Sequence, residues 1–335
     1  MHTHITCLYG HAYTSTAMLA QIATADIAKE MGFDKVPVYS YPVEADSESE
    51  LRTRLDGIFS GVGFGDFIVL QYPTWNNVEF DQAIIRKLRA YPRLKIAIYI
   101  HDVLPLMFEP NAYLMPTMIE IYNMADVLIV PTEAMYQRLR QEGLQVDRYV
   151  VQEMWDHPID LDLDRPEFIR QFHFAGDVNK FNFAKNWQSN LPLRAYSRDP
   201  ETALPDQVIT CGFMRDTELI VNLAKGGFGL VWADDDHINE YFKLCITHKL
   251  GTYLAAGIPV VVPRHLSNHD IIEANHLGLV ADSLEEAQDY VANISAEDYD
   301  DLVDHVDRYR PLITQGFYTK RVLTEAIFKC LDNRS

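Results

Sequence analysis

Short, largely apolar runs alternate with helical patterns along the first half of the chain. The strand-like runs lie at 4–10, 35–41, 66–73, 94–102 and 125–131. Runs of this kind are typical of parallel strands that are buried on both faces. Helical periodicity and capping residues mark the segments between them, at 15–33, 47–59 and 79–90. The alternation predicts a doubly wound α/β domain built on a parallel sheet.

The pattern is interrupted once and then repeats. Residues 153–168 hold two prolines and alternating acids with no helical period, so we interpret this stretch as a linker. Further strands are predicted at 170–176, 206–213, 227–233, 258–263 and 278–281. Further helices are predicted at 215–227, 239–257 and 283–294. The repeated alternation of strands and helices predicts a second Rossmann-like domain. The helical pattern at 315–331 is long enough to pack back on the first domain, so we also predict a returning helix.

Length, charge and composition narrow the class of protein. The 335 residues leave room for two α/β domains of about 150 residues each. A formal net charge of −19 argues against a nucleic-acid partner, which needs a surplus of lysine and arginine. Four cysteines lie far apart without metal-ligand spacing, so we expect reduced thiols and no metal. With no signal-peptide pattern and no apolar window of membrane-spanning length, we expect a cytoplasmic protein without an integral membrane segment.

The first predicted strand leads into a helix through YGHAYTSTAML at 9–19. A helix start offers unpaired N–H groups and a partial positive charge, which favour a phosphate or sugar oxygen. The hydroxyls of Thr14, Ser15 and Thr16 lie at this helix start, although a simple N-cap explains them as well. The chain lacks a GxGxxG motif, which argues against a dinucleotide-dependent dehydrogenase.

The stretch HKLGTYLAAGIPVVVP at 248–263 predicts a helix end, a stop at Gly257 and a buried strand. This turn does not explain Lys249 and Gly251. A lysine charge beside a glycine that allows close backbone approach suits a diphosphate in a protein of net negative charge. The alternative is a solvent-facing lysine on a helix.

Several segments together resemble a known family. LYGHAYTSTAMLAQ, QYPTWNNVEFD, IYIHDVLPLMF, MWDHPIDL and FAGDVNKFNFAKNW occur in this order, followed by GGFGLVW and HKLGTYLAAGIPVVVP. Over nearly its whole length the chain is similar to the glucosyltransferase 3 family, GT-B enzymes that extend the glycan on bacterial serine-rich repeat adhesins. The resemblance implies an α/β GT-B fold, in which two Rossmann-like doubly wound domains face each other across a cleft and a C-terminal helix crosses back to the first domain.

The resemblance also implies a division of labour along the chain. Residues 1–153 would form the acceptor-side domain, 154–314 the nucleotide-sugar-binding domain and 315–335 the returning helix. The donor would be a UDP-sugar, usually UDP-glucose, which acts as a co-substrate with no cofactor and no metal. The acceptor would be a GlcNAc-modified serine/threonine-rich repeat protein, and the enzyme would be a homo-oligomer, a tetramer in many relatives.

Donor-site residues follow from the resemblance position by position. It implies that Thr16 and Lys180 lie near the donor diphosphate, with Lys180 standing where relatives often carry arginine. It implies that Phe213 packs on the nucleotide base. The diphosphate clamp would consist of His248, Lys249, Leu250, Gly251 and Thr252. Many retaining GT-B enzymes carry two glutamates in this region, where this chain holds Leu244 and Thr252, so inverting and retaining transfer both stay open.

The chemistry of the transfer suggests candidates on the acceptor side. Transfer with inversion needs a general base near the acceptor hydroxyl, and Asp102, which follows a predicted buried strand, is our candidate. His101 and Asn76 are candidate acceptor-side groups, and Trp75 is a candidate sugar-stacking platform. The alternatives are a turn or cap role for Asp102 and a packing role for Trp75. We interpret ADDDH at 233–237 as an acidic surface loop and not as a metal site.

Other functions remain open at this stage. The donor could be UDP-GlcNAc or UDP-galactose, in a galactofuranosyl-type transfer, because these sugars differ by contacts that no spacing rule predicts. A non-catalytic GT-B partner subunit would share the layout, but it could dispense with the lysines and with Asp102. A periplasmic-type binding protein or a dehydrogenase is disfavoured by the missing signal peptide and the missing glycine motif.

Overall fold

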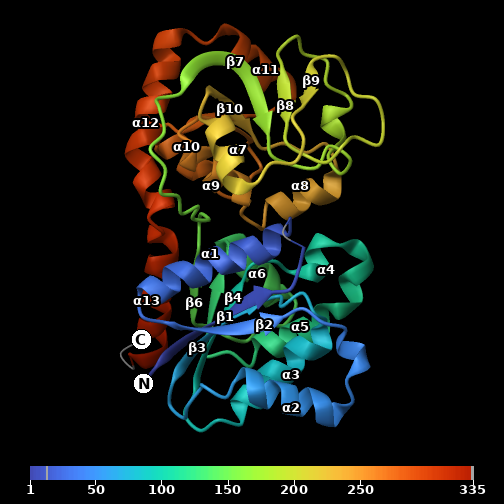
Figure 1. The fold of residues 1–335 in the computed structure, drawn as a ribbon, viewed down its shortest axis with the longest axis vertical. Coiled ribbons are helices and arrows are strands. Elements are labelled where there is room, and N and C mark those ends of the chain that lie inside the picture. The colour runs from blue at the N-terminus through green and yellow to red at the C-terminus, as the bar shows by residue number, and fades with distance from the viewer. Residues whose placement is uncertain (13, 333–335) are drawn as a thin grey trace. The chain divides into compact units, whose positions relative to one another are not determined.

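A computed structural model describes residues 1–12 and 14–332 of the chain. Its contacts divide the chain into two compact units. The first contains Met1–Glu153 and the segment from Tyr318 on, and the second contains Met154–Phe317. Figure 1 shows the elements of both units, each of which has strands with helices beside them.

The first unit is built on a six-stranded sheet in the order β2-β1-β3-β4-β5-β6. All of its strand pairs are parallel. The strands are β1 (Thr3–Tyr9), β2 (Asp34–Tyr39), β3 (Phe67–Tyr72), β4 (Lys95–Ile100), β5 (Val127–Val130) and β6 (Tyr149–Val151). The α-helices are α1 (Thr16–Glu30), α2 (Glu48–Ile58), α3 (Val78–Arg89), α4 (Leu104–Met107), α5 (Met115–Tyr122), α6 (Glu133–Gln141) and, from Tyr318 on, α13 (Phe317–Leu331). Every residue of β3 is buried, which requires cover on both faces of the sheet.

The second unit repeats this plan with the order β12-β11-β10-β7-β8-β9, again with parallel pairs. Its strands are β7 (Glu167–Phe174), β8 (Leu193–Ala195), β9 (Val208–Thr210), β10 (Gly226–Leu230), β11 (Val260–Pro263) and β12 (Gly278–Ala281). Its α-helices are α7 (Asp216–Leu223), α8 (Asp236–Phe242), α9 (His248–Ala255), α10 (His269–Ala274), α11 (Leu284–Asn293) and α12 (Ala296–Thr314). The predicted doubly wound α/β class is therefore confirmed.

The capping residues largely act as the sequence indicates. Ser47 and Glu50 form the reciprocal capping box at the start of α2. Ser283 also caps α11, but Glu286 accepts a hydrogen bond from the backbone N–H of Asp282 instead of that of Ser283. The carboxylate of Glu286 thus bonds the residue before the N-cap, while the hydroxyl of Ser283 still accepts from a backbone N–H of the first turn of α11.

One expectation about the elements is wrong, and two strands were missed. The predicted helix at 239–257 is two helices, α8 and α9, because Thr247 acts as an N-cap and accepts from the N–H of Lys249 at 3.3 Å. The short strands β6 and β8 were not predicted. Each has three residues, which is too few to show a periodicity, and each forms only where its neighbour offers hydrogen bonds.

Helix α13 packs within the first unit. Lys320 forms an ion pair with Glu30 at 3.0 Å, and the guanidinium of Arg321 donates to the carbonyls of Val151 at 3.0 Å and Gln152 at 3.1 Å. None of the helices in the part of the chain that the structure describes has an apolar stretch long enough to span a bilayer.

Gly226 starts β10 in a conformation and a space that only glycine allows. Its φ is +126°, and an added Cβ would lie 1.9 Å from the carbonyl oxygen of Glu167 on the neighbouring strand. We expect Gly226→Ala to lower the free energy of unfolding by about 3 kcal/mol, because it combines a steric clash with backbone strain. Urea unfolding followed by circular dichroism measures this loss.

Gly57 in α2 is the matched control, because an added Cβ there would meet nothing within 4 Å. Gly57→Ala should leave the midpoint unchanged or raise stability by up to about 1 kcal/mol. Equal effects of the two substitutions would contradict the close approach of β10 to β7.

Candidate functional site

Lys249 is the second residue of α9, after His248 and the N-cap Thr247. The residue is half-buried, and its Nζ lies 4.9 Å from the ring centroid of Phe181 and 5.8 Å from that of Phe174. Gly176 leaves room for this side chain, because a Cβ there would lie 3.0 Å from the Cε of Lys249. The ammonium of the lysine thus lies within cation–π range of two aromatic rings.

The ammonium of Lys249 has an electrostatic environment that disfavours its charge. Burial, and secondarily the positive charge of Lys180, lower the pKa of Lys249 to about 8. Below that pH the protonated side chain costs the second unit folding free energy, because burial and a like charge both oppose it. A bound anion would relieve both costs, so the pair of lysines is a candidate anion site.

Lys180 and Phe213 lie on loops that follow strands of the second unit. Lys180 is exposed, with its Nζ 5.6 Å from the ring centroid of Phe181, so Phe181 contacts both lysines. Phe213 follows β9 and is 46% exposed.

His248 stacks on a residue that the sequence did not single out. The rings of His248 and Trp155 lie 4.6 Å apart with an interplanar angle of 15°, and the indole N–H of Trp155 donates to the carbonyl of Ile246. Burial, followed by the charges of His157 and Lys249, lowers the pKa of His248 to about 3. His248 is therefore neutral at physiological pH, and Lys249 supplies the positive charge of this turn.

Gly251 has a structural reason to be glycine. An added Cβ would lie 2.5 Å from the carbonyl oxygen of Trp155, so the missing side chain lets α9 pack against the 154–157 segment. Thr252 extends this contact: its hydroxyl donates to the carbonyl of His248 at 3.1 Å and lies 3.3 Å from Nδ1 of His157. Nε2 of His157 in turn lies 3.1 Å from the carboxylate of Asp216, at the start of α7.

Sequence reasoning missed Trp155, His157 and Asp216. The segment MWDHPIDL pointed to the family but gave no role to its side chains. The contacts show that this segment supports the first turn of α9. Its members join α7 and α9, which are far apart in the sequence, so no periodicity could have shown the connection.

Asp102 and His101 follow β4 in the first unit. His101 is 7% exposed, stacks on Tyr99 and has its Nε2 2.8 Å from the side-chain oxygen of Gln71. Its ring is thus part of a buried polar network between strands. Asp102 is half-buried, and its charge contributes to the raised pKa of the buried Tyr122.

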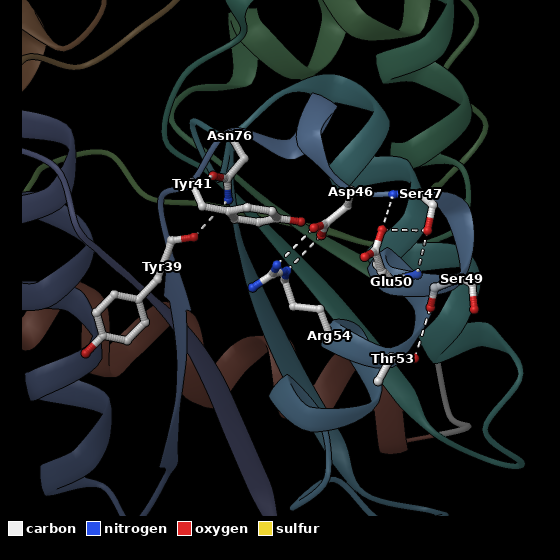
Figure 2. A network of polar contacts seen from close by, with 9 residues as sticks. All are labelled: Tyr39, Tyr41, Asp46, Ser47, Ser49, Glu50, Thr53, Arg54 and Asn76. Carbon is white, nitrogen blue, oxygen red and sulfur yellow. Dashed lines mark hydrogen bonds and ion pairs between the residues drawn. The ribbon is translucent and has the colours of Figure 1, made fainter.

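Trp75 and Asn76 follow β3 in the same unit. Trp75 is half-buried and has a φ of 59°, and its indole nitrogen is buried with no hydrogen-bond partner among the described residues. Figure 2 shows Asn76 beside the end of β2, where its side chain accepts from the N–H of Tyr41 at 3.1 Å and donates to the carbonyl of Tyr39 at 3.4 Å. Asn76 therefore ties two strand ends together.

Thr16 is exposed as the first residue of α1, where Ser15 is the N-cap and accepts from the N–H of Met18 at 3.3 Å. The N-cap alternative thus applies to Ser15 and leaves the hydroxyl of Thr16 outside the cap. Thr16, Asp102, Trp75, Asn76 and His101 belong to the first unit, and the remaining predicted residues belong to the second.

A hollow of about 370 Å³ at the start of α2 contains none of the predicted site residues. It is lined by Asp46, Ser49, Glu50, Thr53 and Arg54. Figure 2 shows that its polar groups are engaged with one another: Arg54 forms a two-point ion pair with Asp46, and Glu50 completes the capping box with Ser47. We therefore regard it as a structural feature.

The described residues contain no group of three or more histidine, cysteine or acidic side chains that could hold a metal ion. In the acidic stretch at 233–237, Asp235 is the N-cap of α8 and accepts from the N–H of Ile238 at 2.9 Å. This carboxylate has a helix-capping role.

Comparison with known proteins relates the whole chain to one family. Residues 2–154 match the family described as glucosyltransferase 3-like, N-terminal domain, and residues 172–326 match its C-terminal domain counterpart. The chain is 46% identical over 335 residues to glucosyltransferase 3 of Streptococcus gordonii, covering 99% of this chain and 100% of that protein. It is 41% identical over 331 residues to glucosyltransferase 3 of Streptococcus parasanguinis, covering 99% of each.

Solved structures with low sequence identity share the fold. HepE from Anabaena, in complex with UDP, has a TM-score of 0.67 at 10% identity, over 96% of this chain and 98% of that one. Sucrose-phosphate synthase from Thermosynechococcus elongatus has a TM-score of 0.65 at 13% identity, over 98% of this chain and 99% of that one. The fold is that of GT-B glycosyltransferases.

The titration of Lys249 can be measured without any substrate. We expect its acylation by a trace of acetic anhydride to reach half its maximum at a pH of about 8, because the lowered pKa frees the amine there. Mass spectrometry of digests across a pH series gives the midpoint, with exposed Lys243 as the reference in the same digest. A midpoint for Lys249 equal to that of Lys243 would show that its ammonium is fully solvated.

Proposed function

The chain belongs to the glucosyltransferase 3-like family of nucleotide-sugar glycosyltransferases, and we propose that it transfers glucose from UDP-glucose to a GlcNAc-modified serine/threonine-rich repeat adhesin. The observation that carries the donor assignment is the pair of lysines, Lys249 and Lys180, whose mutual repulsion an anion would relieve. The name of the two streptococcal relatives supports glucose as the transferred sugar.

In this proposal the second unit binds the donor. Lys249 and Lys180 hold the diphosphate, the N–H groups at the start of α9 add partial positive charge, and Phe213 packs on the uracil. His248, Gly251 and Thr252 keep the first turn of α9 against Trp155 and His157, so that Lys249 is held in place. Thr16, at the start of α1 in the first unit, is the further donor contact that we propose.

In the transfer, a hydroxyl of the acceptor attacks the anomeric carbon. A bond forms between that oxygen and the carbon, the bond to the diphosphate oxygen breaks, and UDP leaves. With inversion, the carboxylate of Asp102 takes the proton of the hydroxyl, and the two lysines offset the charge that develops on the diphosphate. Trp75, Asn76 and His101 are the groups that we assign to the acceptor side.

Assays with several donors separate the proposal from its alternatives. Purified protein is incubated with UDP-glucose, UDP-GlcNAc or UDP-galactose, and UDP release is measured with and without a GlcNAc-modified serine-rich peptide. Release with UDP-glucose that requires the peptide supports the proposal, and preference for another sugar reassigns the donor. UDP binding without any transfer would favour a non-catalytic partner subunit. We also propose that the protein is cytoplasmic and forms a homotetramer. Analytical ultracentrifugation of the purified protein measures the mass of the assembly and so tests the tetramer.

Lys249→Met should weaken UDP binding by about 1–3 kcal/mol, or about 5- to 150-fold, because it removes a charge-assisted contact with phosphate. In the unmodified protein the affinity should also fall as the pH rises above about 8, where the ammonium loses its proton. Isothermal titration calorimetry measures both effects. Lys243→Met, at the exposed C-cap of α8, is the control and should leave the affinity unchanged. An unchanged affinity in Lys249→Met would remove this lysine from the donor site.

Asp102→Asn should lower kcat about 100- to 10,000-fold and leave UDP affinity unchanged, because a positioned base contributes that much and does not contact the donor diphosphate. Initial rates with the peptide acceptor, together with calorimetry, measure the two quantities. A variant that keeps its kcat would assign Asp102 to a turn or to the cap of a helix.

A further inference from the structure

The carboxyl group of Asp81 lies at the end of a buried chain of contacts that no function assigned above uses. It belongs to the first turn of α3 and is 5% exposed. Its Oδ1 accepts from the hydroxyl of Thr74 at 2.5 Å and faces the N–H of Thr74 at 3.4 Å. Its backbone carbonyl accepts from the hydroxyl of Tyr72 at 2.9 Å. Asp81 therefore anchors the loop that follows β3.

The loop that Asp81 anchors is strained at Trp75, the residue after Thr74. Trp75 has a φ of 59°, a left-handed conformation that is costly for a residue with a bulky side chain. Such strain persists only where neighbouring contacts impose it. On one side of Trp75 lies Thr74, which is held by Asp81, and on the other lies Asn76, which is held at the end of β2. Figure 2 shows the second of these anchors.

The position of the strained loop suits a ligand. It follows the carboxyl end of β3, and ligands of doubly wound folds bind at the carboxyl ends of parallel strands. The indole N–H of Trp75 is buried with no partner among the described residues, so it has a hydrogen bond left to donate. An indole offers a sugar both an apolar face and this polar N–H.

We propose that Asp81 is a positioning residue for the acceptor sugar, which holds Thr74 and thereby keeps Trp75 and Asn76 in the conformation that binds the acceptor. The inference rests on the proposed function, because that function places the acceptor in the first unit. Asp81 does not touch the sugar. It acts through the hydroxyl of Thr74.

The protonation state of Asp81 makes its hydrogen bond with Thr74 depend on pH. Burial raises the pKa of Asp81 to about 7, opposed by the hydrogen bonds from Thr74 and reinforced by the negative charge of Glu79. Tyr72 at the end of β3 and Tyr122 on α5 also interact with Asp81 electrostatically, and the charge of Asp102 acts on Tyr122 in turn. An ionised carboxylate accepts hydrogen bonds more strongly than a neutral acid. The hold on Thr74 therefore strengthens as the pH rises through about 7.

Acceptor kinetics test the positioning role. We expect Thr74→Val to raise the KM for the GlcNAc-modified peptide at least about tenfold while UDP affinity stays unchanged, because the donor contacts lie mainly in the second unit. Thr74→Ser, which keeps the hydroxyl, should return the KM to within about twofold. Thr319→Val is the matched control, an equally buried threonine of the same unit at 1% exposure against 2% for Thr74. An unchanged KM in Thr74→Val, or no rescue by serine, overturns the proposal.

The pH profile tests the role of the carboxyl group itself. In the unmodified enzyme the acceptor KM should fall between pH 6 and pH 8, and in Asp81→Asn this dependence should be lost. Asp66→Asn is the control, since Asp66 is a carboxylate of equal burial that precedes β3, where it accepts from the N–H groups of His2 and Gly63. It should keep the pH profile of the unmodified enzyme. A profile that survives in Asp81→Asn overturns the proposal.

A measurement without substrate separates this inference from the proposed function. The indole N–H resonance of Trp75, assigned with Trp75→Phe, should shift with a midpoint near pH 7 in the unmodified protein and in Asp66→Asn, and should stay constant in Asp81→Asn. If no sugar is transferred by the unmodified protein, the proposed function fails while this titration still decides whether Asp81 controls Trp75. If the indole resonance of Trp75 shifts with pH but the acceptor KM is the same in Asp81→Asn as in the unmodified enzyme, the acceptor role of Asp81 is refuted.

Discussion

Parallel strands that are covered on both faces leave only their ends for polar chemistry, and both sheets of this protein obey that constraint. β3 and β11 are buried along their whole length. The groups to which we assign the function therefore follow strands or begin helices. Asp102 comes after β4, Trp75 comes after β3, and Lys249 lies in the first turn of α9. The two units use the same principle for different chemistry, with a cationic turn in one and a polar loop in the other.

Two ionisable groups stand out because burial disfavours the charged form of each. Protonated Lys249 is disfavoured by burial and by Lys180 below a pH of about 8. Ionised Asp81 is disfavoured by burial above a pH of about 7, so its contribution to stability falls as the pH rises from the ordinary range of an aspartate toward that value. Groups that cost folding free energy near neutral pH are explained by binding more readily than by stability.

The start of α9, where we propose that the donor binds, is held in place by contacts with distant residues. Trp155 stacks on His248, and its carbonyl fills the space that a side chain at position 251 would need. His157 bridges Thr252 and Asp216, so the start of α9 is held by a segment about 90 residues earlier in the chain. Several residues that the resemblance assigned to the diphosphate thus also have a packing partner in the described part of the chain.

Much of the architecture was predictable because its causes are local. Apolar runs, capping residues and glycine stops identified the major strands of both sheets, and the Ser47–Glu50 capping box formed as expected. Local reasoning failed where two local preferences compete, as at Thr247, which ends one expected helix and begins another. It also failed for β6 and β8, whose three residues become strands only beside an existing neighbour.

By itself, the sequence determined the α/β class, the family resemblance and the candidate residues, because periodicity and motif order depend on neighbouring positions. Asp81 shows what it left open: within EFDQAIIRKLRA it has the pattern of an ordinary acid in a first helical turn. Only the tertiary structure brought the hydroxyl of Thr74 to 2.5 Å from its carboxylate and removed both from water. The burial of a side chain and its distance from other segments depend on how strands and helices pack. This packing decides whether Asp81 is ionised and which residue it bonds.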